Sequence, residues 1–342
     1  MTDKSVSQEG RGATASPAPP SGEGFAAHVD QAMAEVEALL RASVEGTTVL
    51  EDLGKNLLSA GGKRFRPQLL VASYLAAGGR EPRRAAPLAA AFELIHTASL
   101  IHDDITDDPT LRRRRPAAHR RYGLSRALVA GDFLFARAFE LLTREDYKVA
   151  KAVADAAIAM AEGEHLELVR SFDPTVTMAQ YTEVIDKKTA SLFRAATKAG
   201  ALLAGADDAT AAALEEYGRH LGVAFQLVDD VLDLEPSAAV TGKPSGMDLR
   251  EGRMTSVMLA ALDRLQGTER EFVVRIFTAQ SPAQFDVDRA LAFVRGTGAG
   301  GITLGLARRE QEGAIAALGD RFDPSARAYL VALVSEVVSR RA

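Results

Sequence analysis

The stretch Glu93-Leu-Ile-His-Thr-Ala-Ser-Leu-Ile-His-Asp-Asp-Ile-Thr-Asp-Asp108 has apolar residues at helical spacing and ends in four carboxylates. At about 3.6 residues per turn, Asp103 lies above Asp107 and Asp104 above Asp108, so acidic oxygens crowd one helix end. Without a partner these charges would repel one another. Mg²⁺ prefers oxygen ligands and is usually held by a few carboxylates together with substrate phosphates. The stretch therefore predicts a helix that ends in a divalent-cation site.

The same pattern returns far along the chain. Phe225-Gln-Leu-Val-Asp-Asp-Val-Leu-Asp233 again has two adjacent aspartates, Asp229 and Asp230, with Asp233 on the same helical face. One Asp-Asp-x-x-Asp arises by chance in many helices. Two such helices facing one another can hold a diphosphate between bridging metal ions. We therefore expect the two acidic helices to face a common pocket.

The composition indicates one large globular unit. The chain has 342 residues, of which 47% are hydrophobic, enough for a sizeable core. Its 41 Lys and Arg against 46 Asp and Glu give a net charge of -5, which provides no overall basis for binding nucleic acid. Cysteine is absent, which excludes disulfides and thiolate chemistry. Because we find neither an apolar run of transmembrane length nor a secretory signal, we expect a cytoplasmic protein without a transmembrane segment.

Helical spacing dominates from residue 25 onward, and no segment sustains period-two alternation, which predicts an all-α fold. Residues 1–24 are rich in Ser, Pro, Gly, Ala and Thr and are expected to form a disordered tail. Residues 25–342 are then a single helical domain. The segment Gly296–Gly301 matches the dinucleotide-binding pattern G-x-G-x-x-G, but no strand precedes it, so we expect a turn between helices.

Basic and polar residues near the acidic stretches are candidates for phosphate contacts. The loop Gly61–Pro67 places three cations beside two glycines, which suits either an anion site or a solvated loop. His96 lies two turns before Asp103 on a similar face, which favours a phosphate contact over a structural role. The run Arg112–Arg115 follows the acids, where cations would balance a diphosphate, although such runs are more often solvated. The pair Lys188–Thr189 suits a phosphate contact or a helix cap, and the sequence leaves both open.

Together these motifs resemble those of the trans-isoprenyl diphosphate synthases of the polyprenyl synthetase family, and the pattern is closest to the bacterial medium- and long-chain enzymes. The resemblance runs from about Leu53 to the C-terminus, with GGKRFRP, ELIHTASLIHDDITDD, LRR, AGDFLFARAFELL, KKTASLF, FQLVDDVLD and GKPSGMDLREG in family order. It implies a single helical bundle around a deep central cavity and a homodimer. It also implies Mg²⁺, about three ions per active site when diphosphate is bound, bridging the two aspartate motifs. The substrates would be isopentenyl diphosphate and an allylic diphosphate.

The resemblance also assigns roles to individual residues. Those expected to be catalytic are Asp103, Asp104, Asp107, Lys188, Asp229 and Lys243. The metal ligands would come from Asp103, Asp107, Asp108, Asp229, Asp230 and Asp233. The allylic diphosphate would contact Arg112, Lys188, Thr189, Gln226, Lys243 and Arg253. Isopentenyl diphosphate would contact Gly62, Lys63, Arg66, His96 and Arg113.

Three residues depart from the family pattern. Arg114 stands where glycine is usual, which would alter how the basic loop closes. Arg253 replaces a common lysine, which keeps the charge but loses a compact ammonium. Glu167 stands where glutamine is frequent. The first two changes remove no group that the reaction requires.

The residues before the first aspartate bear on product length. Ala98 and Ser99 are small and would line the cavity just below the diphosphate, so a growing chain can pass. Ile95 and Phe92 lie on successive turns further down, at a rise of about 1.5 Å per residue, and Phe92 or Phe139 would form the floor. We therefore expect a product of about twenty carbons or more.

The reaction that the resemblance implies is stepwise prenyl transfer. Metal ions and cations would stabilise the departing diphosphate while the double bond of isopentenyl diphosphate attacks the allylic carbon, and a proton would then be lost. A terpene cyclase is the nearest alternative, but it would not need the GGKR element. A non-catalytic regulatory subunit would be expected to lack one acidic motif. A nucleic-acid module would rest on Arg112–Arg115 with Arg120 and Arg121, and the adjacent acids argue against it.

Overall fold

The computed structural model describes residues 22–45, 64–112, 115–234 and 246–340. The prediction of an all-α fold is confirmed, because the described residues are almost entirely helical. Their strands are two short segments, β1 (Leu111–Arg112) and β2 (Arg115–Pro116), which pair antiparallel. Residues 22–24, predicted to end a disordered tail, instead begin the first helix. The apolar spacing starts only at Phe25, so it placed the start of the helix too late.

The described helices fall into long members of a bundle and shorter connecting elements. The long helices are α1 (Gly22–Ala42), α3 (Phe65–Ala76), α4 (Ala86–Asp107), α6 (Leu124–Leu142), α7 (Tyr147–Arg170), α9 (Ser191–Leu203), α10 (Asp208–Leu234), α15 (Ala299–Leu318) and α16 (Pro324–Val338). The shorter ones are η1 (Pro82–Ala85), α5 (Ala118–Tyr122), α8 (Met178–Ile185), η2 (Asp186–Ala190), α11 (Met247–Arg250), α12 (Ser256–Leu262), α13 (Gly267–Phe277) and α14 (Gln284–Gly296).

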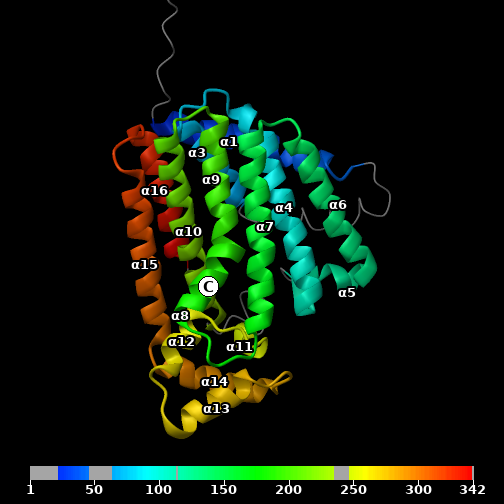
Figure 1. Cartoon of the computed structure of the whole chain (residues 1–342), viewed down its shortest axis with the longest axis vertical. Coiled ribbons are helices and arrows are strands. Elements are labelled where there is room, and N and C mark those ends of the chain that lie inside the picture. The colour runs from blue at the N-terminus through cyan, green and yellow to red at the C-terminus, as the bar shows by residue number, and fades with distance from the viewer. Residues whose placement is uncertain (1–21, 46–63, 113–114, 235–245, 341–342) are drawn as a thin grey trace, which may run out of the picture.

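Most of the long helices stand side by side along the long axis of the molecule, whereas α1 lies across the upper end (Figure 1). In Figure 1, α4, α7, α9 and α10 run upright, with α15 and α16 on one flank and α5 and α6 on the other. Helices α13 and α14 lie across the lower end. One large cluster of buried apolar residues runs through the bundle, and a second cluster joins α11 to α14. The site described below lies where the C-terminal turns of α4 and α10 approach this second cluster.

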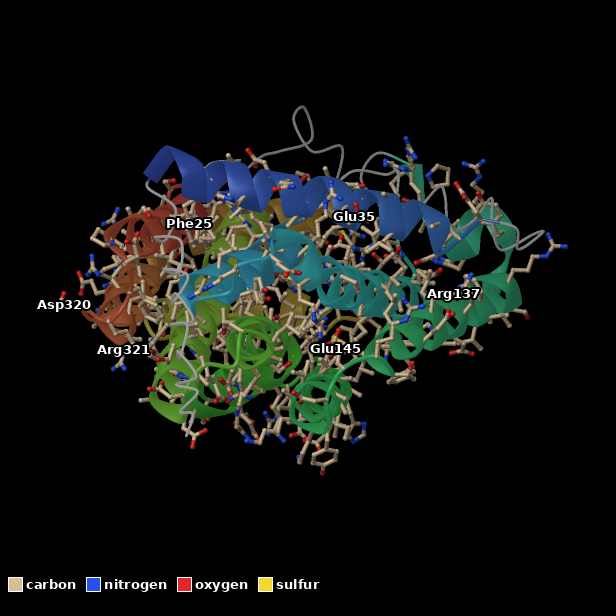
Figure 2. The ribbon with its side chains drawn as sticks, turned by 90° about the horizontal axis from the view of Figure 1, so that it is seen from above. Phe25, Glu35, Arg137, Glu145, Asp320 and Arg321 are labelled. Atoms are coloured by element: carbon tan, nitrogen blue, oxygen red, sulfur yellow. The ribbon has the colours of Figure 1, made fainter. Side chains whose placement is uncertain are left out.

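Helix α1 shows how apolar spacing in the sequence becomes packing. Its residues Phe25, Val29, Ala32 and Val36 recur three or four positions apart, and each is at most 2% exposed. Seen from above, α1 lies along one side of the bundle, with Phe25 near one end and Glu35 further along (Figure 2). Burying a Val or Leu side chain favours folding by about 1.5–3 kcal/mol. The apolar face therefore fixes this helix against the bundle.

The turn predicted in the glycine-rich segment near residue 298 is confirmed. Helix α14 ends at Gly296 and α15 begins at Ala299, and Gly298 between them has φ of 73°, a conformation that favours glycine. Among the described helices, none is by itself long and apolar enough to cross a membrane. The pair α14 and α15 passes that test only when taken together across a bend of 63°.

Candidate active site

Both acidic motifs border cavities at the C-terminal turns of α4 and α10. A cavity of about 180 Å³ has Asp103, Asp107 and Asp230 in its wall. An adjoining cavity of about 280 Å³ has Asp107, Asp229 and Asp233 in its wall. The residues common to the two walls include Asp107, Arg112, Gln226, Asp248 and Arg253. The structure thus brings the two motifs together, although they are more than a hundred residues apart in the sequence.

The first motif is held by cations from other segments. Asp104 is 1% exposed, and its Oδ1 accepts a hydrogen bond of 2.6 Å from Nε of Arg112 on β1. Asp107 forms an ion pair with Arg253, which follows α11. Burial raises the pKa of Asp103 to about 7, and the nearby Glu164 carboxylate adds to this effect. The last turn of α4 therefore carries acids whose charge depends on the cations around them.

The fourth acid of this stretch leaves the helix, so the prediction that Asp108 stacks on Asp104 is wrong, and its role as a metal ligand stays a prediction. Helix α4 ends at Asp107, and Asp108 follows in a left-handed conformation with φ of 52°. This turns its carboxylate outward, where it contacts Nε2 of His119 at 2.9 Å and Nη2 of Arg120 at 2.5 Å. Helical spacing could not predict this, because it assumes that the helix continues.

In the second motif, Asp230 is the centre of a buried hydrogen-bond network. Its Oδ2 accepts hydrogen bonds from the phenol of Tyr181 at 2.6 Å and from the hydroxyl of Ser256 at 3.0 Å. Its Oδ1 accepts a hydrogen bond of 3.0 Å from Gln226, which in turn accepts one of 2.8 Å from Thr189. Burial raises the pKa of Asp230, and these donors oppose the rise. The geometry favours a role in holding neighbouring residues over the predicted role in metal binding.

The other two acids of the second motif lie nearer the surface. Asp233 accepts hydrogen bonds of 3.1 Å from the backbone amides of Met247 and Asp248, the first residues of α11. It therefore ties the C-terminal end of α10 to that short helix. Asp229 lies 3.5 Å from Nη1 of Arg340 near the C-terminus of the chain, and its side chain is 41% exposed. Asp229 and Asp233 border the same cavity wall as Asp107.

Lys188 and Thr189 lie on a π-helical turn, η2, inserted between α8 and α9. Such turns are frequent at functional sites. Two glycines permit close packing here: a Cβ on Gly163 would lie 2.3 Å from the backbone nitrogen of Lys188, and one on Gly222 would lie 2.6 Å from Cα of Ala190. No local sequence pattern indicates the π turn, because no Gly or Pro interrupts this segment. The features of the sequence that relate to this turn are Gly163 and Gly222, whose small size permits the close packing.

Lys188 lies between two glutamates of α7. Its Nζ is 2.6 Å from Oε2 of Glu164 and also contacts Oε2 of Glu167. Burial disfavours the charged ammonium, but these carboxylates outweigh it and raise the pKa of Lys188. Arg253 forms a similar cluster with Asp107, Glu167 and Glu251. Glu164 and Glu251 were not predicted as site residues, because their place in the site depends on contacts between distant segments.

A larger and more apolar cavity, of about 450 Å³, opens beside the acidic one. The two cavities share Asp103, Lys188, Thr189 and Gln226. Arg66 and His96, both predicted to bind isopentenyl diphosphate, line this cavity, and Arg66 Nη1 lies 3.0 Å from His96 Nε2. The guanidinium of Arg66 also stacks 4.4 Å above the ring of Phe193. A charged end and an apolar interior therefore meet at Asp103.

The residues predicted to set product length are only partly at this cavity. Ser99 lines it, but Ala98 is fully buried in the main core and does not. Ile95 and Phe92 are also in that core, and neither is in the cavity wall. Phe139 is 50% exposed on α6 and is absent from the wall as well. The prediction that Phe92 or Phe139 forms the floor of the cavity is therefore wrong, because Phe92 is buried in the core and Phe139 is half exposed.

Other apolar residues provide the wall instead. Leu100, Phe135 and Met160 line the cavity from α4, α6 and α7. Phe135 belongs to the segment AGDFLFARAFELL, but the residue predicted from that segment was Phe139, one turn later. Gly62, Lys63, Arg113 and Lys243 lie outside the described residues, so their predicted roles remain predictions.

The side chains fit a divalent cation by their chemistry. Within the part of the chain that the structure describes, no three acidic or histidine side chains are arranged as a ready metal site. The acids are instead paired with Arg112, Lys188 and Arg253. A cation beside the buried Asp103 carboxylate would favour its charged form, which burial opposes. Carboxylate oxygens are also the ligands that Mg²⁺ prefers.

The comparisons with known proteins agree with this geometry. The family model described as Polyprenyl synthetase matches residues 47–294. The octaprenyl diphosphate synthase of Escherichia coli is 36% identical over 313 residues, which cover 91% of this chain and 96% of that protein. A short chain isoprenyl diphosphate synthase of Methanothermobacter thermautotrophicus is 44% identical over 245 residues, covering 70% of this chain and 72% of that protein.

A solved structure extends the likeness to three dimensions. The polyprenyl synthase from Caulobacter crescentus CB15, complexed with calcium and isoprenyl diphosphate, superposes with a TM-score of 0.89 at 40% identity. The match covers 96% of this chain and 100% of the Caulobacter chain. The chain therefore belongs to the polyprenyl synthetase family and is a prenyl diphosphate synthase of the trans-prenyltransferase type.

Proposed function

We propose that the chain is a Mg²⁺-dependent synthase that condenses isopentenyl diphosphate with an allylic diphosphate to make a trans-polyprenyl diphosphate of about twenty carbons or more. The observation that carries this proposal is the meeting of a charged cavity, bordered by Asp103, Asp107 and Asp230, with an apolar cavity of about 450 Å³. A charged diphosphate with an apolar tail needs both environments side by side. The two cavities adjoin, because their walls share Asp103, Lys188, Thr189 and Gln226.

The proposed residue roles combine the resemblance to the family with the positions of those side chains that the structure describes. Asp103 and Asp107 from one wall and Asp229 from the other would hold metal ions. Arg112, Lys188, Thr189, Gln226 and Arg253 would bind the allylic diphosphate, together with Lys243. Arg66 and His96 would bind isopentenyl diphosphate, together with Gly62, Lys63 and Arg113. When bound, Mg²⁺ would supply positive charge to the leaving diphosphate.

The side chains of the protein then stabilise the charge of the leaving diphosphate and orient the substrates. In the proposed reaction the allylic carbon–oxygen bond breaks, the double bond of isopentenyl diphosphate forms the new carbon–carbon bond, and a carbon-bound proton is lost to the released diphosphate. Burial opposes the charge of Lys188 and of Arg253, but the surrounding carboxylates outweigh it and raise the pKa of each group, so both stay charged. They therefore present fixed positive charge where negative charge develops on the leaving group. No protein nucleophile takes part.

Product length is proposed from the apolar cavity. Leu100, Phe135 and Met160 form walls that a prenyl tail can contact, and the small Ser99 lies beside Leu100. The related enzymes carry names that range from short chain to octaprenyl, so the family alone leaves the length open. A tail of about twenty carbons or more is our proposal for this cavity.

A homodimer is also proposed, from an apolar face on α6. Leu124, Leu128, Val129 and Phe139 are 48–59% exposed. Leu128 and Phe139 are eleven residues apart, close to three helical turns, so they share a face with Leu124. An exposed apolar face of this kind marks an interaction site. A second copy of this chain would cover it.

The experiment is an incubation with excess isopentenyl diphosphate, Mg²⁺ and, in separate reactions, geranyl, farnesyl or geranylgeranyl diphosphate, followed by chromatography of the dephosphorylated alcohols. We expect linear alcohols of about twenty carbons or more, formed only when isopentenyl diphosphate is present. Cyclic hydrocarbons formed without isopentenyl diphosphate would indicate a terpene cyclase. No product with any starter would contradict the proposed activity.

A further inference from the structure

Glu167 lies between two cations that the proposed function assigns to the allylic diphosphate. Its Oε2 contacts Nζ of Lys188 and lies 3.4 Å from Nε of Arg253. These three residues come from α7, from the π turn η2 and from the segment after α11. One carboxylate oxygen therefore joins three separate parts of the site. All three side chains are about one-fifth exposed, at 19–21%.

Both cations keep another acidic partner without Glu167. Lys188 also pairs with Glu164 at 2.6 Å. Arg253 also pairs with Asp107 and lies 3.2 Å from Glu251. Removing one member of a buried pair is costly when the remaining charge is left alone. Here neither cation would be left alone, so we expect a variant without the Glu167 carboxylate to fold.

The position of Lys188 is set by backbone packing. Helix α7 approaches the π turn so closely at Gly163 that a Cβ there would lie 2.3 Å from the nitrogen of Lys188. On the other side, Gly222 of α10 packs as closely against Ala190. The π turn is thus fixed between two helices. Replacing the carboxylate of Glu167 would change the charge around Lys188 but not the position of its backbone.

We infer that Glu167 acts as an internal anion that occupies Lys188 and Arg253 in the ligand-free protein and competes with the diphosphate for them. The inference rests on the proposed function, because it assumes that an allylic diphosphate binds these cations. A diphosphate oxygen that approaches either cation must displace the carboxylate or share the cation with it. Glu167 therefore weakens the binding of the allylic substrate and promotes release of the diphosphate product. It is a positioning and specificity-determining residue.

The same pair of helices offers a matched control. Glu162, on α7, pairs with Lys187 of the π turn at 2.8 Å, and these side chains are 55% and 34% exposed. Neither residue is in the wall of the charged cavity. The variant E162Q removes one carboxylate from the same helix, two turns or less from Glu167, without touching the site. Its exposure also makes its ion pair weak.

The test compares wild type, E167Q, E167D and E162Q. Isothermal titration with inorganic diphosphate in the presence of Mg²⁺ gives Kd, and steady-state kinetics with geranyl diphosphate give the KM of each substrate. We expect E167Q to lower the Kd for diphosphate and the KM for geranyl diphosphate about tenfold, equivalent to about 1.4 kcal/mol. The KM for isopentenyl diphosphate should change less than about twofold, well under 1.4 kcal/mol. E167D, which keeps the charge, and E162Q should remain close to wild type.

Unchanged or weaker diphosphate binding by E167Q would overturn the inference, as would an equal change in E167D and E167Q. An equal drop in the KM of both substrates would also overturn it, because the competition concerns the allylic site. These failures are distinct from failure of the proposed function. If wild type neither binds diphosphate nor uses an allylic substrate, the proposed function itself is wrong.

Discussion

The phenol of Tyr181 donates a hydrogen bond of 2.6 Å to the buried carboxylate of Asp230, across 49 positions of sequence. The two residues come from α8 and α10, and Ser256 at the start of α12 donates to the same oxygen. Through Gln226 the network reaches Thr189 on the π turn. Three separate segments of the site are therefore held in place by one buried acid.

The variant Y181F tests this role. It removes one donor from a buried carboxylate, which raises the pKa of Asp230 further and leaves its charge less stabilised. A hydrogen bond to a charged group is worth about 1.5–3 kcal/mol, so the free energy of unfolding should fall by about that amount in urea titrations. The matched control is Y147F, because Tyr147 is 77% exposed. A loss in Y181F no larger than in Y147F would contradict the proposed network.

Stability without metal should depend on pH. The pKa of Asp103 is raised to about 7 by burial, and that of Glu251 is also raised to about 7 by burial. Each folded carboxyl therefore binds more protons than its unfolded form between about pH 4 and pH 7. The free energy of unfolding accordingly falls as pH rises through that window.

A divalent cation should offset this loss, so Mg²⁺ is expected to raise Tm more at pH 8 than at pH 6. Differential scanning fluorimetry with increasing MgCl₂ at the two pH values measures the difference. The variant D103N lacks one of the titrating carboxyls and should show a smaller difference. An equal Tm increase at both pH values in wild type would show that Mg²⁺ does not bind these acids.

Product length should respond to Ser99, which lines the apolar cavity. The variant S99F fills part of that cavity and is expected to shorten the product, as measured by chromatography of the dephosphorylated alcohols. Ala98 is the control, because it is fully buried in the core and does not line the cavity. The variant A98V should lower the free energy of unfolding by about 1–3 kcal/mol through overpacking and leave the product length unchanged. The reverse pattern would show that Ala98 faces the growing chain.

The apolar face of α6 should be needed for association. The variant L128E places a charge at the centre of that face, so a homodimer would dissociate, because an unpaired charge is costly to bury. Light scattering after size-exclusion chromatography measures the mass. The control is F285E on α14, where Phe285 is 76% exposed and lies outside the face. A wild-type monomer, or an L128E variant with unchanged mass, would contradict the proposed interface.

Much of the architecture follows from local rules. Helical spacing predicted the all-α fold. The two acidic motifs predicted that their helices face a common pocket. The spacing also placed Asp103 and Asp107 on one face, and both line the charged cavity. These features repeat along a helix, so they can be read from neighbouring residues in the sequence.

The rest depends on where helices end and on contacts between distant segments. The predicted position of Asp108 on the helix was wrong, because α4 ends one residue earlier, at Asp107. The π turn at Lys188 depends on close packing against Gly163 and Gly222. The contact of Arg253 with Glu167 joins the segment after α11 to α7, which is far away in the sequence. No local pattern encodes such pairs.

The most direct measurement of the central claim is the rate of prenyl product formation by D103N and D108N, two isosteric changes within the same acidic stretch. Asp103 lines the cavity shared with the second motif, whereas Asp108 is turned outward to His119 and Arg120. We expect D103N to lose about 10²–10³-fold in kcat, the scale of removing one electrostatic stabiliser, and D108N to stay within about threefold of wild type. A D103N enzyme with near-normal turnover, or a D108N enzyme as impaired as D103N, would contradict the account.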